Sequence, residues 1–77
     1  MNDQDVLRHI TALVDAEQGL YGQEHISDDD RVRLQALEVE LDQYEDLLRQ
    51  RRALRGAGKD PGQAHLRGAG TVEHYEQ

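Results

Sequence analysis

The chain has 77 residues, of which 36% are hydrophobic, and a formal net charge of −7. A chain of this size forms one small domain and buries roughly 60% of its unfolded surface at best, so a lone core is marginal without self-association. Because the sequence contains no cysteine, disulfide bonds are excluded as a source of stability.

Hydropathy and cysteine content also suggest where the protein resides. No apolar run approaches the roughly 20 residues that a membrane-spanning helix needs, and the acidic N-terminus lacks the basic-then-apolar pattern of a secretory signal. The missing cysteines fit a reducing compartment. We therefore expect a cytoplasmic protein with no membrane partner.

A first helix is predicted over residues 3–21. Asn2 or Asp3 can cap its N-terminus. Apolar residues follow at alternating spacings of three and four, which is the period of an amphipathic helix packed on another helix. They are Val6, Ile10, Leu13 and Leu20. Gly22 is expected to end this helix in a left-handed conformation.

A second helix is predicted over residues 28–55. Ser27 is a strong N-cap candidate, and three aspartates follow it in the first turn. No glycine or proline interrupts the chain from there until Gly56. Its apolar seam consists of Leu34, Leu37, Leu41, Tyr44 and Leu48.

The two seams agree on one antiparallel register. If the chain folds back near residues 25 and 26, facing residues have numbers that add up to a constant. The sums for Leu13 with Leu37, Ile10 with Leu41 and Val6 with Tyr44 agree to within one residue. The sequence therefore predicts an all-α fold, an antiparallel two-helix hairpin of coiled-coil-like packing over residues 1–56.

Apolar residues outside these seams suggest self-association. Two helices cannot cover all of this surface, and a symmetric dimer that forms a four-helix bundle is the simplest way to bury it. The candidate self-association residues are Leu7, Val14, Tyr21, Leu47 and Leu54. The alternative is that scattered exposed apolar residues are normal on a folded protein.

Charge is distributed unevenly along the chain. Residues 1–48 hold thirteen acidic and three basic side chains, whereas residues 49–77 hold three acidic and six basic ones. The longer second helix should project beyond the first, and its overhang carries four candidate partner-binding residues: Arg49, Arg51, Arg52 and Arg55. The alternative is that these cations only complement the dipole of the helix C-terminus.

Residues 57–77 are predicted to form a glycine-rich linker and an extended C-terminal tail. Residues 57–70 contain four of the seven glycines and the only proline, and this composition is incompatible with a continued helix. Val72 and Tyr75 are candidate partner-binding residues near the end of the tail, although terminal segments often fray.

No catalytic, cofactor-binding or metal-binding residues are predicted. Asp28, Asp29 and Asp30 lack the alternating spacing of a calcium loop and are explained by helix capping. The four histidines are scattered and form no helical pair with the i, i+4 spacing of a zinc site. The glycine-rich stretches neither follow a strand nor open a helix, so they do not fit a phosphate loop. We therefore expect no enzyme and no cofactor.

A resemblance covers nearly the whole chain. Its motifs are Leu37-Glu38-Val39-Glu40-Leu41-Asp42-Gln43, Asp46-Leu47-Leu48-Arg49-Gln50-Arg51-Arg52-Ala53-Leu54-Arg55, Gly58-x-Asp60-Pro61 and Gly70-Thr71-Val72-Glu73-x-Tyr75. Together they resemble a small actinobacterial family of unknown function, the DUF2630 type. The resemblance implies a small helical hairpin protein from a high-GC Gram-positive bacterium, and no activity or site residue.

Two classes of function remain. The first is a non-enzymatic protein–protein interaction or regulatory module, in which an oligomeric hairpin presents its arginine-rich end and tail to a protein partner. The alternative is a nucleic-acid or ribonucleoprotein binder, associated for example with transcription, that uses the arginine-rich end of the second helix. The net charge of −7 and the lack of aromatic residues among the basic ones disfavour nucleic acid.

Overall fold

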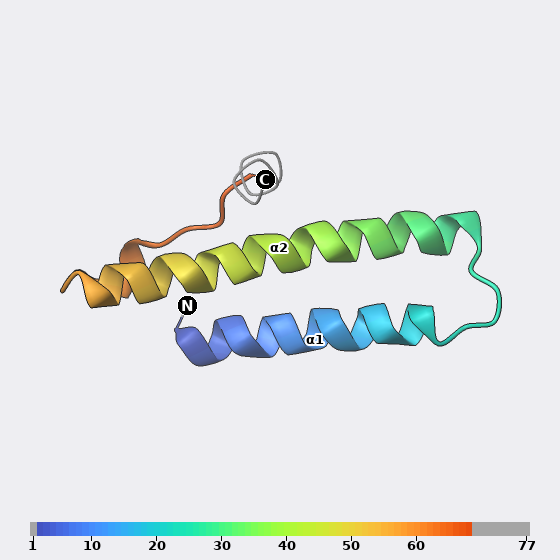
Figure 1. Ribbon diagram of the computed structural model, residues 1–77, viewed down its shortest axis with the longest axis horizontal. Helices are drawn as coiled ribbons and strands as arrows, with labels where there is room; N and C mark the ends of the chain where they lie inside the picture. The colour runs from blue at the N-terminus through green and yellow to red at the C-terminus, as the bar shows by residue number, and fades with distance from the viewer. Residues whose placement is uncertain (1, 69–77) are drawn as a thin grey trace.

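The fold is an antiparallel pair of helices, seen in a computed structural model that describes residues 2–68. Helix α1 spans Asp3–Tyr21 and helix α2 spans Asp28–Gly56, and the short 3₁₀ helix η1 spans Pro61–Gln63. The two long helices lie side by side, and α2 extends beyond the N-terminal end of α1 (Figure 1). Within the described residues the predicted all-α hairpin is confirmed, and both helices begin where the sequence predicts.

Local hydrogen bonds explain both helix starts. Asn2 forms a capping box with Asp5: the Asp5 N–H donates to Asn2 Oδ1 at 2.8 Å, and the Asn2 N–H donates to Asp5 Oδ2 at 3.3 Å. At α2 the Asp30 N–H donates to Ser27 Oγ at 3.1 Å. Asp28, Asp29 and Asp30 complete an acidic first turn that favours the positive end of the helix dipole.

The helix ends differ from the prediction at one glycine. Gly22 has a φ of −74°, so the expected left-handed terminator is wrong, and an ordinary turn leads into the connection. The left-handed glycine is Gly58, with a φ of 73°. There the Lys59 N–H donates to the Leu54 carbonyl at 2.8 Å, which closes the end of α2.

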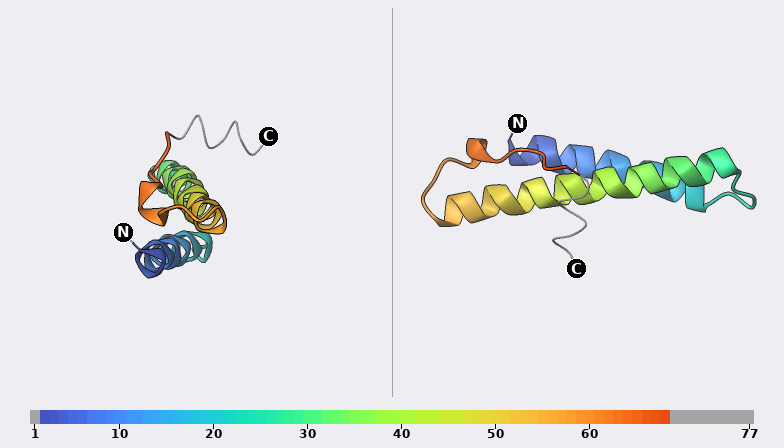
Figure 2. Two further views of the ribbon diagram at one scale, coloured as in Figure 1. Left: turned by 90° about the vertical axis from the view of Figure 1, so that its left-hand side faces the viewer. Right: turned by 90° about the horizontal axis from the view of Figure 1, so that it is seen from above.

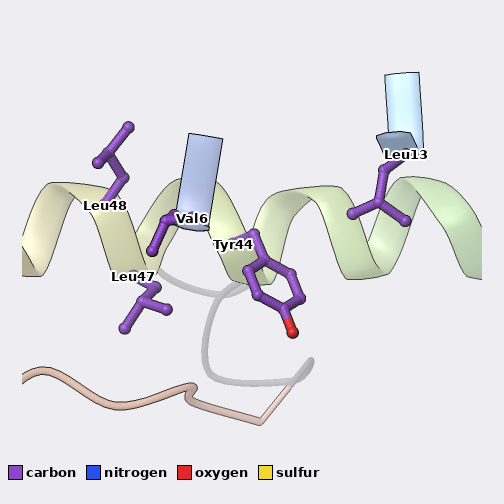
Figure 3. Close-up of a cluster of buried hydrophobic side chains, with 5 residues drawn as sticks. All are labelled: Val6, Leu13, Tyr44, Leu47 and Leu48. Carbon is purple, nitrogen blue, oxygen red and sulfur yellow. The ribbon is translucent and has the colours of Figure 1, made fainter. Parts of the chain in front are cut away.

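The core lies between the helices near the N-terminal end of α1. Val6 is fully buried and packs in one cluster with Leu13, Tyr44, Leu47 and Leu48 (Figure 3). Ile10, Leu37 and Leu41 pack against this cluster, as the predicted register requires. The Tyr44 ring also stacks on His9 at a centroid separation of 4.0 Å, so the histidine covers one edge of the core.

The segment after α2 is the main departure from the prediction. Residues 57–68 were expected to form a linker or an extended arm. Instead the chain turns at Gly58, forms η1 and runs back along α2 toward the hairpin tip (Figure 2). Ala64 packs against the core cluster. We call residues 61–68 the fold-back segment, and it supplies a third layer over part of α2.

The core makes a direct prediction about stability. Leu13→Ala should lower the free energy of unfolding by about 2–3 kcal/mol, because Leu13 is buried and its truncation leaves a cavity in the core. Chemical denaturation measures this change. Gln18→Ala, at an exposed position of the same helix, is the control and should stay within about 0.5 kcal/mol of the wild type. Equal effects would contradict the assigned core.

Candidate functional site

Two of the four arginines predicted as a free overhang are used inside the chain. Arg51 Nε lies 2.5 Å from Asp3 Oδ1, and Arg55 Nη2 lies 2.7 Å from Asp3 Oδ2. Arg51 is only 9% exposed, and its Nη1 also donates to the Pro61 carbonyl at 3.2 Å. The pKa of the Asp3 carboxyl is lowered, mainly by its hydrogen bonds to Arg51 and then Arg55. This acidic residue at the start of α1 therefore ties the two helices together.

The predicted arginine cluster consequently does not form one open patch. Arg49 and Arg52 are exposed, and Arg49 has an interaction of its own. Arg51 and Arg55 are directed to Asp3 because α1 begins close enough to reach the last turns of α2. The expectation that all four arginines project freely is wrong for Arg51 and Arg55. Val72 and Tyr75, the other candidate partner-binding residues, lie outside the described residues.

A buried carboxylate anchors the fold-back segment. Asp46 is 2% exposed and forms an ion pair with Arg67, whose Nε donates to Asp46 Oδ2 at 2.9 Å and whose Nη2 donates to Oδ1. Gln50 Nε2 donates to the same Oδ2 at 2.8 Å. Hydrogen bonding to Arg67 lowers the pKa of the Asp46 carboxyl, although burial opposes this shift. The charged form of Asp46 is therefore the one that holds the segment.

Two glutamines of α2 bind the backbone of the same segment. Gln50 Nε2 donates to the His65 carbonyl at 2.9 Å, and its Oε1 accepts from the His65 N–H at 3.4 Å. Gln43 Nε2 donates to the Arg67 carbonyl at 3.1 Å. These residues are seven apart, so they lie on one face of α2. Their side chains replace the backbone partners that an irregular segment lacks.

Leu47 and Leu54 have different environments from those expected of self-association residues. Leu47 is 5% exposed, and together with Arg51, Gly62, Ala64, His65 and Leu66 it lines a small cavity of about 220 Å³ under the fold-back segment. Figure 3 shows its side chain directed toward that segment. The self-association role predicted for Leu47 is therefore wrong, because its own chain covers it. Leu54 is half-buried beside Lys59 and Gln63.

The candidate self-association row on α1 is more open. Leu7 is 45% exposed and Tyr21 is 56% exposed, while Val14 between them is half-buried. Tyr21 Oη donates to Glu38 Oε1 at 2.8 Å, and this bond raises the pKa of the tyrosine. Gln4, Leu7, Arg8 and Thr11 line a shallow depression at one end of the row. This row is an apolar surface on the flank of α1, next to the side that packs on α2.

A second apolar surface lies on α2 beyond the fold-back segment. It is an open groove of about 530 Å³ whose lining residues are Val32, Gln35, Ala36, Val39, Glu40, Gln43, Tyr44 and Leu66. Val32 is 69% exposed and Leu66 is 46% exposed. The groove begins where the described part of the fold-back segment ends.

Neither a metal cluster nor a membrane span is found in the part of the chain that the structure describes. Residues 2–68 hold no group of three or more His, Cys, Asp or Glu side chains that could bind a metal ion. Over the same residues neither long helix is apolar enough to cross a bilayer.

Sequence reasoning missed the residues that fix the fold-back segment. Asp46, Gln43 and Gln50 look like ordinary solvent-facing positions of an amphipathic helix, and Arg67 lies in a glycine-rich stretch. One signal was present: Asp46 directly precedes Leu47 and Leu48, so it stands beside the apolar seam where a charge needs a partner. Its partner could not be identified because the stretch containing Arg67 was expected to remain unpacked.

Breaking the Asp46–Arg67 pair should be costly. Arg67→Ala leaves the buried Asp46 carboxylate without its counter-charge and should lower the free energy of unfolding by about 3 kcal/mol, the low end for a buried pair because Arg67 is only half-buried. Urea denaturation measures the loss. Arg52→Ala, at an exposed position of α2, is the matched control and should change stability by less than about 0.5 kcal/mol. A similarly small effect of Arg67→Ala would show that the pair does not hold the segment.

The ion pairs of Asp3 and Asp46 predict that the stability of the fold depends on pH. The pKa values of Asp3 and Asp46 are lowered in the folded chain. Their stabilisation is therefore complete above the unfolded pKa of about 4 and is lost as pH falls through the lower folded values. Urea titrations in this acid range should show a smaller loss of stability for Asp46→Asn than for the wild type. Parallel acid curves would contradict the assignment for Asp46.

Comparison with known proteins places the chain in a family. The family model described as "Protein of unknown function (DUF2630)" matches residues 2–77. An uncharacterized protein of Mycobacterium bovis is 48% identical over 77 residues, with 95% of this chain and 88% of that protein covered. Uncharacterized proteins of two Mycobacterium tuberculosis strains match with the same identity and coverage, and no solved structure is significantly similar. The resemblance predicted from the motifs is confirmed: this chain belongs to the DUF2630 family of small proteins, which has relatives in actinobacteria.

Proposed function

We propose that this protein is a non-enzymatic interaction module that pairs with a second copy through the Leu7–Val14–Tyr21 row of α1. The observation that carries this proposal is the exposure of Leu7 and Tyr21 on α1, beside the side of the helix that packs on α2. The proposed setting is the cytoplasm, in keeping with a chain that has no cysteine.

The spacing of the row supports a symmetric pair. Leu7, Val14 and Tyr21 are seven residues apart and therefore follow one side of α1. In a two-fold arrangement of antiparallel α1 helices, Leu7 of one copy meets Tyr21 of the other and the two Val14 side chains meet at the axis. The resulting assembly is a four-helix bundle. A small chain with a marginal core gains stability from burying such a row.

The arginine-bearing end of α2 is the proposed contact for a protein partner. In the two-fold arrangement this end lies away from the paired row, at each end of the bundle. Arg49 and Arg52 are exposed there, whereas Arg51 and Arg55 stiffen the end through Asp3. We propose an acidic protein surface as the partner of this end, because exposed guanidinium groups recognise carboxylates.

Light scattering at two protein concentrations and two salt concentrations tests the pairing. The wild type should have twice the 8.8 kDa mass of one chain, and this mass should be insensitive to salt because the interface is apolar. Leu7→Glu places a charge in the interface and should give a monomer that keeps its helical circular dichroism. Val32→Glu, at an exposed apolar position on α2, is the control and should remain paired. A wild-type monomer at both concentrations would overturn the proposal.

Nucleic-acid binding is the second proposal, and fewer observations support it than support the pairing of two copies. Of the six basic residues after residue 48, Arg51 and Arg55 are paired with Asp3 and Arg67 is paired with Asp46. Binding to phosphate would weaken steeply as salt rises. Binding of the wild type to a fluorescent DNA duplex, followed over a salt series, tests this role. We expect no binding at physiological salt; saturable binding that Arg52→Ala weakens would favour nucleic acid instead.

A further inference from the structure

The groove along α2 continues the path of the fold-back segment. Pro61 contacts Arg51, His65 contacts Gln50, and Arg67 contacts Asp46 and Gln43. Each later residue of the segment thus meets an earlier part of α2. The chain is directed toward the groove, and Leu66 already forms part of the groove wall.

The groove lies on the face of α2 that already binds the segment. Gln50, Gln43 and Ala36 are spaced by seven residues, so they share one side of the helix. Val39 and Val32 lie close to the same line, four residues from Gln43 and from Ala36. Along this face of α2, the glutamines that bind backbone groups of the fold-back segment are followed by an apolar strip of Val39, Ala36 and Val32. Val32, at the end of the strip, is 69% exposed.

The length of chain after Arg67 fits this strip. Val32 precedes Gln43 by eleven residues, which is about 16 Å along α2. Val72 follows Arg67 by five residues, and a chain in polyproline II geometry covers about 15 Å over that length. Val72 can therefore reach most of the strip, including Ala36, and its glycine neighbours Gly68 and Gly70 allow close approach to the helix.

The sequence after the fold-back segment has a matching apolar period. Leu66, Ala69, Val72 and Tyr75 recur at every third position. Ala64, where the chain leaves η1, has φ −67° and ψ 146°, which is polyproline II geometry. This geometry repeats every three residues, so a chain that continues in it carries these four side chains along one side.

We propose that residues 69–77 bind in the groove on α2 of the same chain, with Val72 against the Ala36–Val32 strip. Polar groups at the groove suit such an occupant. A polyproline II backbone makes no internal hydrogen bonds, and Gln35, at the groove, has no side-chain hydrogen bond among the described residues. It can hold the backbone near Val72 as Gln43 holds Arg67. This intramolecular site is independent of the α1 row that we propose for pairing.

Engineered disulfides test the proposal, because the native chain has no cysteine. The full-length double variant Ala36→Cys with Val72→Cys should form an intrachain disulfide on mild oxidation. The control, Thr11→Cys with Val72→Cys, has an equally exposed partner on α1. Because the docked tail raises the local concentration of one thiol at the other, we expect the Ala36 pair to form at least about tenfold faster. Equal rates for the two pairs would overturn the proposal.

The size of the disulfide-linked product identifies which copy supplies the tail. A product of single-chain mass supports binding within one chain, whereas a two-chain product as the main species would overturn it. Repeating the oxidation in the Leu7→Glu background separates the two proposals. The intrachain product should persist there even when pairing of α1 is abolished.

A measurement without cysteines gives an independent check on the full-length chain. Val72→Ser combined with Tyr75→Ser should shift the methyl NMR signals of Val32 and Val39 and leave those of Leu7 unchanged. Unchanged signals at Val32 and Val39 would overturn the proposal. The methyl signals of Leu13, a member of the core cluster, report whether the fold is retained.

Discussion

The ion pair between Asp46 and Arg67 is the interaction on which the arrangement of this small protein depends. Two helices can cover each other on one side only, so a hairpin alone leaves Leu47 in contact with water. The fold-back segment covers this leucine, and it has neither a helix nor a sheet to hold it in place. A carboxylate that is 2% exposed, with Arg67 and Gln50 as its partners, provides the anchor instead.

A second carboxylate, that of Asp3, holds the arginine-rich end of α2 by ion pairing in the same way. Asp3 accepts hydrogen bonds from Arg51 and Arg55 and so connects the first turn of α1 to the last turns of α2. Arg51 in turn donates to the Pro61 carbonyl, which links this contact to η1. A run of arginines that reads as a binding patch is thus in large part an internal framework. The exposed arginines that remain are carried by a helix end that these contacts hold rigid.

Two apolar surfaces remain, and they differ in character. The row on α1 follows a regular helix and suits a second copy of itself, as in the proposed pair. The groove on α2 has polar side chains among its lining residues and lies in the direction of the departing chain, which suits an extended segment. Each surface therefore has a proposed occupant of its own, and we expect substitutions on one surface to leave the other intact.

The sequence alone determined the helices, their starts and their antiparallel register, because periodicity and capping are local properties and the two seams have to face each other. It also revealed the family through its motifs. Only the tertiary structure decided what Asp3, Asp46 and Arg67 do, since their ion-pair partners lie 21 to 52 residues away in the chain. Glycine and proline indicate that a helix ends, but they carry no information about where the chain goes next. That path depends on the buried charge of Asp46, which only folding brings next to its partner Arg67.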